Sequence, residues 1–403
     1  MSQRTLERVR ARRRPLERCA GDVRSFLADD WGKRAAVRLG GPLPAPSDPR
    51  GFEDLLSLDD VDRFLTTSAL RSPFFRLVKA GERIAEAAYT RSGRAGSRDV
   101  SGIADPVRVA ALFGDGATIV LQGLHRWSEP VARFCRDLEL DLGHPCQVNA
   151  YVTPPGAQGL DLHEDAHDVF VLQAFGRKRW ELLAAPGEPP RDPLDVEVTP
   201  GDTIYLPAGT PHAARAQDEL SGHLTVGVHV TSWRDVLTGV IGRATGSAED
   251  PVPAGWLEDP DGFAEELRER LTALASALGD VDVQAEAGER RERFLSTRAQ
   301  LARGTIADRA DPVVVDDTSV VARRPGSVCE LSMRPDRLVV LLGDRLLEMP
   351  AWLERGMRQV ARLDEDDELA VRDLALHVPD PGSRAVLVRR LVREGLLTIR
   401  DGR

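Results

Sequence analysis

Cysteine is scarce in this sequence, and no two of its four cysteines form a Cys-x-x-Cys pair. A disulfide framework or a zinc ribbon is therefore disfavoured, and a reducing compartment fits better. No apolar run reaches the roughly 18 residues that a membrane-spanning helix needs. An excess of positive charge is also missing, since 64 acidic residues outnumber 54 basic ones and the net charge is −10. This balance argues against a generally basic nucleic-acid-binding protein and favours a basic partner.

The first 18 residues carry seven arginines, but no apolar segment follows them. This pattern is not typical of a secretion signal, which pairs a short basic stretch with an apolar one. We therefore expect a cytoplasmic protein without a membrane segment.

The length of 403 residues predicts two or three domains, and a hydrophobic content of 42% allows a substantial core. Residues 1–145 are predicted to be mainly helical. From Cys146 onward, short segments rich in β-branched and aromatic residues alternate with proline and glycine, which predicts a β-sandwich or barrel. Gly176 separates the strand patterns 168–175 and 177–183, where a tight hairpin turn would need a glycine.

The C-terminal part differs in composition and in the spacing of its apolar residues. Residues 244–260 are rich in Gly, Pro, Ala and Asp and indicate a linker, and apolar residues then repeat at helical spacing over 261–278 and 286–302. Two helices outside a β core have little to bury alone, so we expect them to pack on each other or on a second subunit. Short strands and helices beyond residue 311, with a helical pattern at 368–376, suggest a winged helix. The predicted domains are 1–243, 244–310 and 311–403.

Residues 163–167 have the sequence H-E-D-A-H, which allows two metal sites. On a helix, His163 and His167 would share one face and bind zinc, while Glu164 activated water for peptide hydrolysis. On an extended segment, alternation places His163 and Asp165 on one face and Glu164 on the other. Prolines and glycines at 154–159 leave a helix little room to form, so the extended alternative is favoured.

An extended His163-x-Asp165 pair needs one more histidine to complete a two-histidine, one-carboxylate site. His212 supplies it, 47 residues after Asp165 and at the end of a Gly-Asp turn, short strand and Pro-x-Gly bend. This separation lets several strands of a barrel bring the ligands together. Such a triad leaves open positions that suit Fe(II) with a bidentate co-substrate and dioxygen.

Six segments carry a resemblance to a known family: 73–79 (PFFRLVK), 149–159 (NAYVTPPGAQG), His163-x-Asp165, 169–173 (VFVLQ), 176–180 (GRKRW) and 207–212 (PAGTPH). They resemble the Jumonji-C-type ribosomal oxygenases of the cupin superfamily, which are Fe(II)- and 2-oxoglutarate-dependent protein hydroxylases. The resemblance implies an α+β protein with a double-stranded β-helix (cupin/Jumonji-C) core and helical N-terminal elements. It further implies a helical dimerisation region and a C-terminal winged-helix-like domain.

The same resemblance implies iron ligands at His163, Asp165 and His212, and a basic residue that grips the distal carboxylate of 2-oxoglutarate. By position this residue is Lys178. Strand alternation puts Lys178 opposite to its two neighbours, but the sequence does not say which face points inward, so Arg177 and Arg179 stay open as alternatives.

Further polar residues are candidates for the surroundings of this site. Asn149, Tyr151 and Thr225 are weaker candidates for contacts with the co-substrate. His223 and His229, six residues apart on the last barrel strand, either line the pocket or are ordinary core or rim residues.

The function that follows is hydroxylation of a protein side chain by a homodimeric enzyme that uses Fe(II), 2-oxoglutarate and dioxygen. A basic ribosomal protein is the substrate that the family and the acidic net charge favour. A small peptide or metabolite is a rival substrate within the same chemistry. A zinc metallopeptidase using His163-Glu164-x-x-His167 and a non-catalytic winged-helix binding protein remain alternatives from other classes. Arginines at 384–393 suggest nucleic-acid contact, but the acidic run 364–368 opposes it.

Overall fold

The computed structural model describes residues 15–40, 51–158, 160–185, 187, 192–216, 218–245, 250–299, 301, 303–310, 314–364 and 367–400. The chain divides into two compact units, residues 1–230 and 231–403, which we call the N-terminal and C-terminal units. The predicted arginine-rich start lies, apart from Arg18, outside the described residues. None of the described helices is both long enough and apolar enough to cross a bilayer.

The N-terminal unit is built on two antiparallel sheets that face each other. The smaller has the order β10-β9-β12, with β10 at Leu194–Val198, β9 at Lys178–Leu182 and β12 at His212–Ala216. The larger has the order β1 (Ala36–Arg38), β11 (Thr203–Leu206), β8 (Asp168–Phe175), β13 (Ser221–Val228), β7 (Cys146–Thr153), β6 (Thr118–Leu121), β2 (Phe75–Lys79) and β3 (Glu82–Arg83). The predicted cupin/Jumonji-C type of core is confirmed.

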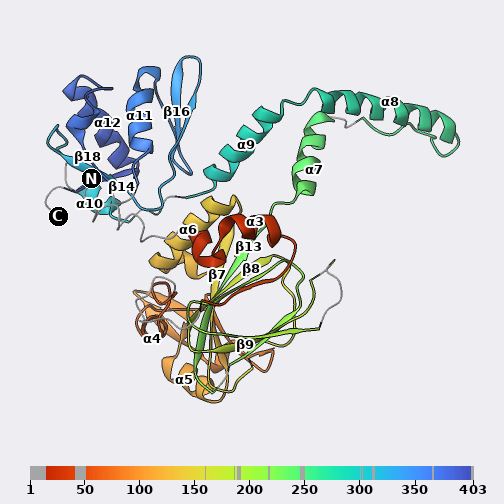
Figure 1. Ribbon diagram of the computed structural model, residues 1–403, viewed down its shortest axis with the longest axis vertical. Coiled ribbons are helices and arrows are strands. Elements are labelled where there is room, and N and C mark those ends of the chain that lie inside the picture. The colour runs from red at the N-terminus through yellow and green to blue at the C-terminus, as the bar shows by residue number, and fades with distance from the viewer. Residues whose placement is uncertain are drawn as a thin grey trace. The chain divides into compact units, whose positions relative to one another are not determined.

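The larger sheet is covered on both faces. Side chains from β8, β11, β9 and β10 form one apolar cluster between the sheets. A second cluster packs helices on the outer face, and Figure 1 shows α3 and α6 beside β7, β8 and β13. These helices are α2 (Pro15–Ala20), α3 (Val23–Asp29), α4 (Leu58–Thr66), α5 (Pro106–Gly114) and α6 (Glu129–Leu142). Burial on both faces explains why β8 is apolar along almost its whole length.

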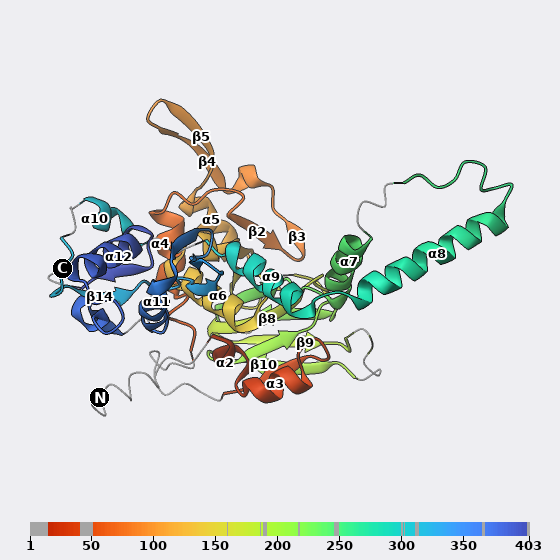
Figure 2. The same cartoon turned by 90° about the horizontal axis from the view of Figure 1, so that it is seen from above.

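The prediction that residues 1–145 are mainly helical is wrong in part, because they also contribute strands β1 to β6. The hairpin of β4 (Thr90–Ala95) and β5 (Arg98–Ala104) is rich in Arg, Gly and Ser and largely exposed. Figure 2 shows it projecting from the rest of the N-terminal unit. A strand pair with no buried face carries no alternation of apolar residues, so its sequence gives little signal.

Gly176 forms the predicted turn between β8 and β9 with a φ of 63°. A Cβ added here would lie 1.8 Å from the carbonyl oxygen of Leu220, so the neighbouring backbone would have to move. Gly176→Ala is therefore expected to lower the free energy of unfolding by roughly 2–4 kcal/mol, measured by chemical denaturation. Gly96→Ala is the matched control, because its φ is 60° and nothing lies within 4 Å of the added Cβ. It should cost only about 1 kcal/mol, and equal losses in the two variants would contradict the clash.

The C-terminal unit begins with helices α7 (Trp233–Ala244), α8 (Pro260–Gly279) and α9 (Val283–Ser296). Helices α7 and α8 contact each other, and Arg243 of α7 pairs with Glu286 of α9. No residue of α7 or α8 is buried in the described chain. Large apolar side chains are exposed along them, including Trp233, Leu237, Leu267 and Leu271.

The rest of the C-terminal unit has its own apolar core, formed by two small sheets and the helices packed on them. Residues 368–376 are not the predicted helix, since they form a short strand followed by a 3-10 turn at Val371–Leu374. The elements are α10 (Thr305–Ala310), β14 (Val320–Arg323), β15 (Glu330–Met333), β16 (Arg337–Leu341), β17 (Leu346–Pro350), α11 (Glu354–Ala361), β18 (Glu368–Ala370), α12 (Pro381–Arg393) and β19 (Leu397–Ile399).

Helix α12 carries the arginines that suggested nucleic-acid contact, and the structure gives two of them other partners. Arg384 is buried, pairs with Asp317 at 2.5 Å and donates to the carbonyl oxygens of Val378 and Pro379. Arg390 pairs with Glu394 at 2.8 Å. These two side chains therefore stabilise the unit itself.

Candidate metal centre

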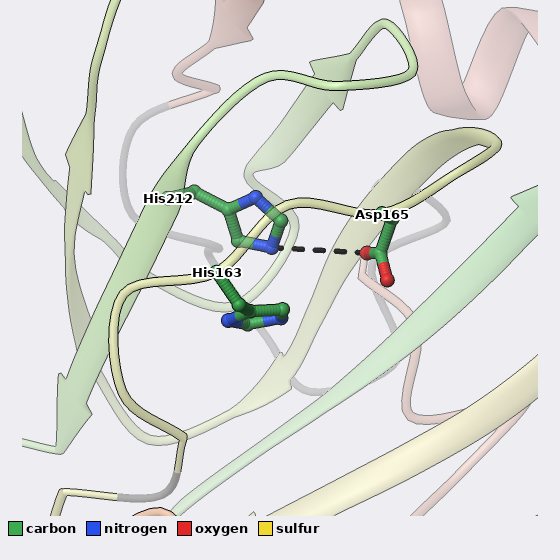
Figure 3. Close-up of side chains that lie close together, drawn as sticks. All are labelled: His163, Asp165 and His212. Atoms are coloured by element: carbon green, nitrogen blue, oxygen red, sulfur yellow. Dashed lines mark ion pairs between the residues drawn. The ribbon is translucent and has the colours of Figure 1, made fainter.

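Three side chains meet where the His163 segment crosses the start of β12. His163 and His212 form an isolated antiparallel bridge, with the N–H of each donating to the carbonyl oxygen of the other at 3.1 and 2.8 Å. One ligand atom each from His163, Asp165 and His212 lies within 4.8 Å of the others. Figure 3 shows the two imidazoles and the carboxylate approaching one another. The structure thus brings together the three residues predicted as metal ligands.

Both imidazoles are held in the tautomer that suits a metal ligand. Nδ1 of His163 lies 2.8 Å from the carbonyl oxygen of Asp161, and Nδ1 of His212 lies 2.9 Å from that of Thr210. Because a carbonyl oxygen only accepts hydrogen bonds, each Nδ1 must carry the proton. Each Nε2 is then left with a lone pair for a cation.

Asp165 completes the group from the same loop. Its own carbonyl oxygen accepts the N–H of Gly209 at 2.8 Å, which ties it to the turn before His212. The distance from its Oδ2 to Nε2 of His212 is 3.8 Å, too long for a hydrogen bond but within the span of two atoms bound to one ion. Burial lowers the pKa of His212, which keeps this imidazole neutral at neutral pH.

The same loop lacks the helix that a zinc peptidase needs. Residues 163–167 contain no helical turn, and Glu164 is exposed. His167 does not belong to the triad. Its ring packs on that of His229, with the ring centroids 5.2 Å apart. The H-E-x-x-H match therefore has no helical basis in the structure.

A cavity extends from the triad into the space between the two sheets. Its lining includes the three predicted ligands and ten further residues: Thr118, Tyr151, Leu160, Val169, Val171, Lys178, Trp180, Ala214, His223 and Thr225. Tyr151, Lys178 and Thr225 were predicted to lie near the site. The predicted residue Asn149 is not in this lining, and its side-chain oxygen accepts the N–H of Gly123 at 2.9 Å.

Lys178 is the basic residue that faces this cavity. It is buried, and its Nζ donates to Oγ1 of Thr153 at 3.0 Å, which also lies 3.1 Å from Oγ1 of Thr118. Burial lowers the pKa of Lys178 to about 7, and no carboxylate among the residues that the structure describes offsets the lost hydration. The alternatives Arg177 and Arg179 point outward and pair with Glu219 and Asp195 at 2.8 and 2.6 Å.

The side chain of Asp168 supports the loops that carry the triad. Its Oδ2 accepts the hydroxyl of Tyr205 at 2.5 Å and its Oδ1 accepts the N–H of Ala208 at 2.9 Å. Asp168 therefore joins the start of β8 to the Pro-x-Gly bend.

Sequence reasoning missed several residues of this cavity. Trp180 shares its face of β9 with Lys178, so period-two alternation was a signal that could have found it. Thr118 of the lining, and Thr153 that holds Lys178, needed the pairing of β6 with β7, which the sequence does not reveal. Of the two histidines predicted on the last barrel strand, His223 lies within β13 and His229 directly follows its last residue, Val228. His223 lines the cavity, whereas His229 is exposed beyond the strand.

Comparison with known proteins confirms the resemblance drawn from the sequence. Residues 125–236 match the family model described as the JmjC domain. The chain is 30% identical to ribosomal oxygenase 1 of Rattus norvegicus over 283 residues, which are 60% of this chain and 45% of that protein. It is 31% identical over 212 residues to a bifunctional lysine-specific demethylase and histidyl-hydroxylase NO66 of Branchiostoma floridae, covering 52% and 32% of the two chains. The chain thus spans less than half the length of these curated relatives.

Solved structures extend the likeness in fold along nearly the whole chain. The ribosomal oxygenase YcfD of Escherichia coli, in complex with cobalt and 2-oxoglutarate, matches with a TM-score of 0.52 at 19% identity. The match covers 94% of this chain and 98% of YcfD. At this identity the likeness concerns the fold.

Proposed function

We propose that this protein is an Fe(II)- and 2-oxoglutarate-dependent dioxygenase that hydroxylates a protein side chain. The observation that carries the proposal is the juxtaposition of a two-histidine, one-carboxylate group with a buried lysine in one cavity. The two histidines have their tautomers fixed, and no carboxylate pairs with the lysine within the described ranges, so the cavity suits a cation at one end and an acid at the other. The curated relatives are named as oxygenases and a histidyl-hydroxylase.

In this proposal, His163, Asp165 and His212 hold Fe(II) on one face. The iron supplies activation of dioxygen and oxidation of an unreactive C–H bond when it is bound. The chain itself keeps each Nε2 unprotonated through the carbonyl oxygens of Asp161 and Thr210. Cobalt and 2-oxoglutarate bound to YcfD support this choice of metal and co-substrate.

Lys178 is the proposed partner of the distal carboxylate of 2-oxoglutarate. An ammonium with a single hydroxyl partner has two N–H groups left to donate, and an anion there would restore the interactions lost on burial. Tyr151 and Thr225 line the same cavity as Lys178 and the triad and are proposed to contact the co-substrate. For Asn149 such a contact stays a prediction.

The proposed substrate is a basic protein, with a ribosomal protein as the class favoured by the names of the relatives. The net charge of −10 supports a basic partner through long-range attraction. A small peptide or metabolite stays the alternative within the same chemistry. The cytoplasm is the proposed compartment.

We further propose the predicted division into residues 1–243, 244–310 and 311–403, with a homodimer formed through the helices of the middle region. Exposed apolar side chains such as Leu267 and Leu271 on a helix without buried residues support a second copy as their partner. The C-terminal elements are proposed to form a winged-helix-like domain that contacts protein rather than nucleic acid. The internal ion pair of Arg384 supports this choice.

The test is anaerobic binding of Fe(II) and 2-oxoglutarate, followed by succinate release on admission of air. The wild type is expected to bind the acid only with metal present and to release succinate. His212→Ala should lose both properties while keeping its thermal transition. Absence of metal-dependent 2-oxoglutarate binding by the wild type would refute the proposed function, and assays of zinc content and peptidase activity would follow.

A further inference from the structure

His223 is a buried imidazole inside the cavity whose role is not explained by packing alone. Its ring stacks on Tyr151 with an interplanar angle of 5° and a centroid distance of 5.1 Å, and meets the edge of Trp180 at 5.3 Å. Its Nδ1 is buried and has no hydrogen-bond partner in the described part of the chain. A buried ring nitrogen without a partner costs free energy, so a role that supplies the missing partner is indicated.

The register of the strands places His223 between Lys178 and the metal ligands. Along β9, Lys178 contacts Thr153, Trp180 contacts His223, and Leu182 pairs with His212. On the opposite sheet, Ser221 pairs with Thr153 and His223 pairs with Tyr151. Residues two apart on a strand are about 7 Å apart. His223 is therefore displaced from the Lys178 end of the cavity by about this distance, in the direction of the triad. An acid that reaches from the metal to Lys178 must therefore pass beside this imidazole.

Two further observations favour donation from His223 to an anion. Burial, together with the positive charge of Lys178, holds the pKa of His223 well below its ordinary value, so the ring is neutral and carries one N–H. The rings that contact His223 are those of Tyr151 and Trp180, and the carboxylate of the described lining, Asp165, belongs to the predicted metal site rather than to the surroundings of His223.

We propose that His223 is a specificity-determining residue, whose imidazole N–H donates alongside the Lys178 ammonium to the distal carboxylate of the bound 2-oxo acid. This inference rests on the proposed function. Two converging donors would distinguish a five-carbon dicarboxylate from a 2-oxo acid of the same length that ends in a methyl group.

The test compares 2-oxoglutarate with 2-oxopentanoate, which replaces the distal carboxylate by a methyl group. Calorimetry on the full chain loaded with Co(II) gives both dissociation constants. His223→Phe retains the stacked ring but has no imidazole N–H. It is expected to raise the dissociation constant of 2-oxoglutarate about 10- to 100-fold and that of 2-oxopentanoate about twofold or less. His223→Asn offers an N–H near the position of Nδ1 and should recover part of the loss.

His229→Phe is the matched control, because this histidine is exposed beyond the end of β13 and does not line the cavity. It should leave both dissociation constants unchanged. If His223→Phe weakens both acids equally, or neither, His223 only packs and the inference is wrong. A wild type that binds no 2-oxo acid would instead refute the proposed function, and this inference with it.

A measurement on the unaltered protein covers the case in which the variants do not fold. In the Zn(II)-loaded wild type labelled with ¹⁵N-histidine, 2-oxoglutarate should slow exchange of one imidazole N–H with water. This signal should be absent with 2-oxopentanoate. The same imidazole spectrum with both acids would overturn the inference.

Discussion

Asp165→Ala is expected to abolish metal-dependent turnover, whereas Glu164→Ala, one residue earlier, leaves it unchanged. Asp165 supplies the single anionic ligand atom of the triad, within 4.8 Å of both histidine nitrogens. Loss of residues that merely orient a ligand already costs 10- to 100-fold in metal affinity, so loss of the ligand itself should cost at least about 100-fold. Titration with Co(II), followed by its visible absorption, and succinate release in air would measure the two effects.

Glu164 is the matched control because it is exposed and makes no part of the triad. A zinc peptidase would show the opposite result, since its glutamate activates water and its aspartate at this position is dispensable. Thermal unfolding of both variants should lie close to that of the wild type, because the side chain of Asp165 is 33% exposed. Retained Co(II) affinity in Asp165→Ala would show that the triad is not the metal site.

Strands that are buried on both faces could be predicted from the sequence. The range 168–175 agrees with β8, and 147–153 agrees with β7 to within one residue. Their side chains form the contacts that make the sheet, so composition and structure have the same cause. By contrast, β12 has the sequence HAARA, with no β-branched residue. Its strand conformation comes from pairing with β9, which local preferences do not encode.

The grouping of His163, Asp165 and His212 could be predicted, because a two-histidine, one-carboxylate site limits the residue types and the first two residues lie only two apart in the sequence. The surroundings of Lys178 could not, because they depend on which strands face each other. Thr153 and Lys178 lie in different sheets, and their hydrogen bond exists only when these sheets close on each other. His223 shows the same limit, since the face that it presents depends on the register shift of β13 against β8 between Gly222 and His223.

Lys178→Met is expected to give a more stable protein that no longer binds 2-oxoglutarate well. The lysine is buried with no anionic partner among the described residues, so its charged form loses hydration that a single hydrogen bond to Thr153 replaces only in part. A methionine of similar length removes that cost and should raise the free energy of unfolding by about 1–3 kcal/mol near neutral pH. The same change removes the proposed charge partner of the co-substrate and should weaken binding about 100-fold or more.

Arg179→Met is the matched control for Lys178→Met. Arg179 adjoins Lys178 but points outward, where its pair with Asp195 is half exposed. An exposed ion pair contributes little to the free energy of unfolding, so this energy should change by less than about 1 kcal/mol. Co-substrate binding should not change. A Lys178→Met variant that is less stable than the wild type would mean that interactions in the free protein already offset the lost hydration of the lysine.

The pH dependence of stability gives a second measurement on the same pair of proteins. Burial lowers the pKa of Lys178 from 10.5 in the unfolded chain to about 7 in the folded one. The unfolded state therefore binds more protons between these values, so this group destabilises the fold fully below about pH 7 and progressively less as the pH rises. The stability advantage of Lys178→Met should thus be largest at pH 6–7 and shrink towards pH 10, as followed by urea denaturation.

Protonation of Lys178 lowers the stability of the free protein, but it should favour binding of 2-oxoglutarate. A dicarboxylate needs the ammonium form of Lys178, so binding takes up a proton once the pH exceeds the pKa of the free site. The affinity of the wild type is expected to fall with pH above about 7, by up to about tenfold per unit, while the residual affinity of Lys178→Met stays flat. Calorimetry in two buffers of different ionisation enthalpy would count the protons taken up. A wild-type affinity that is constant from pH 7 to 9 would place the co-substrate away from Lys178.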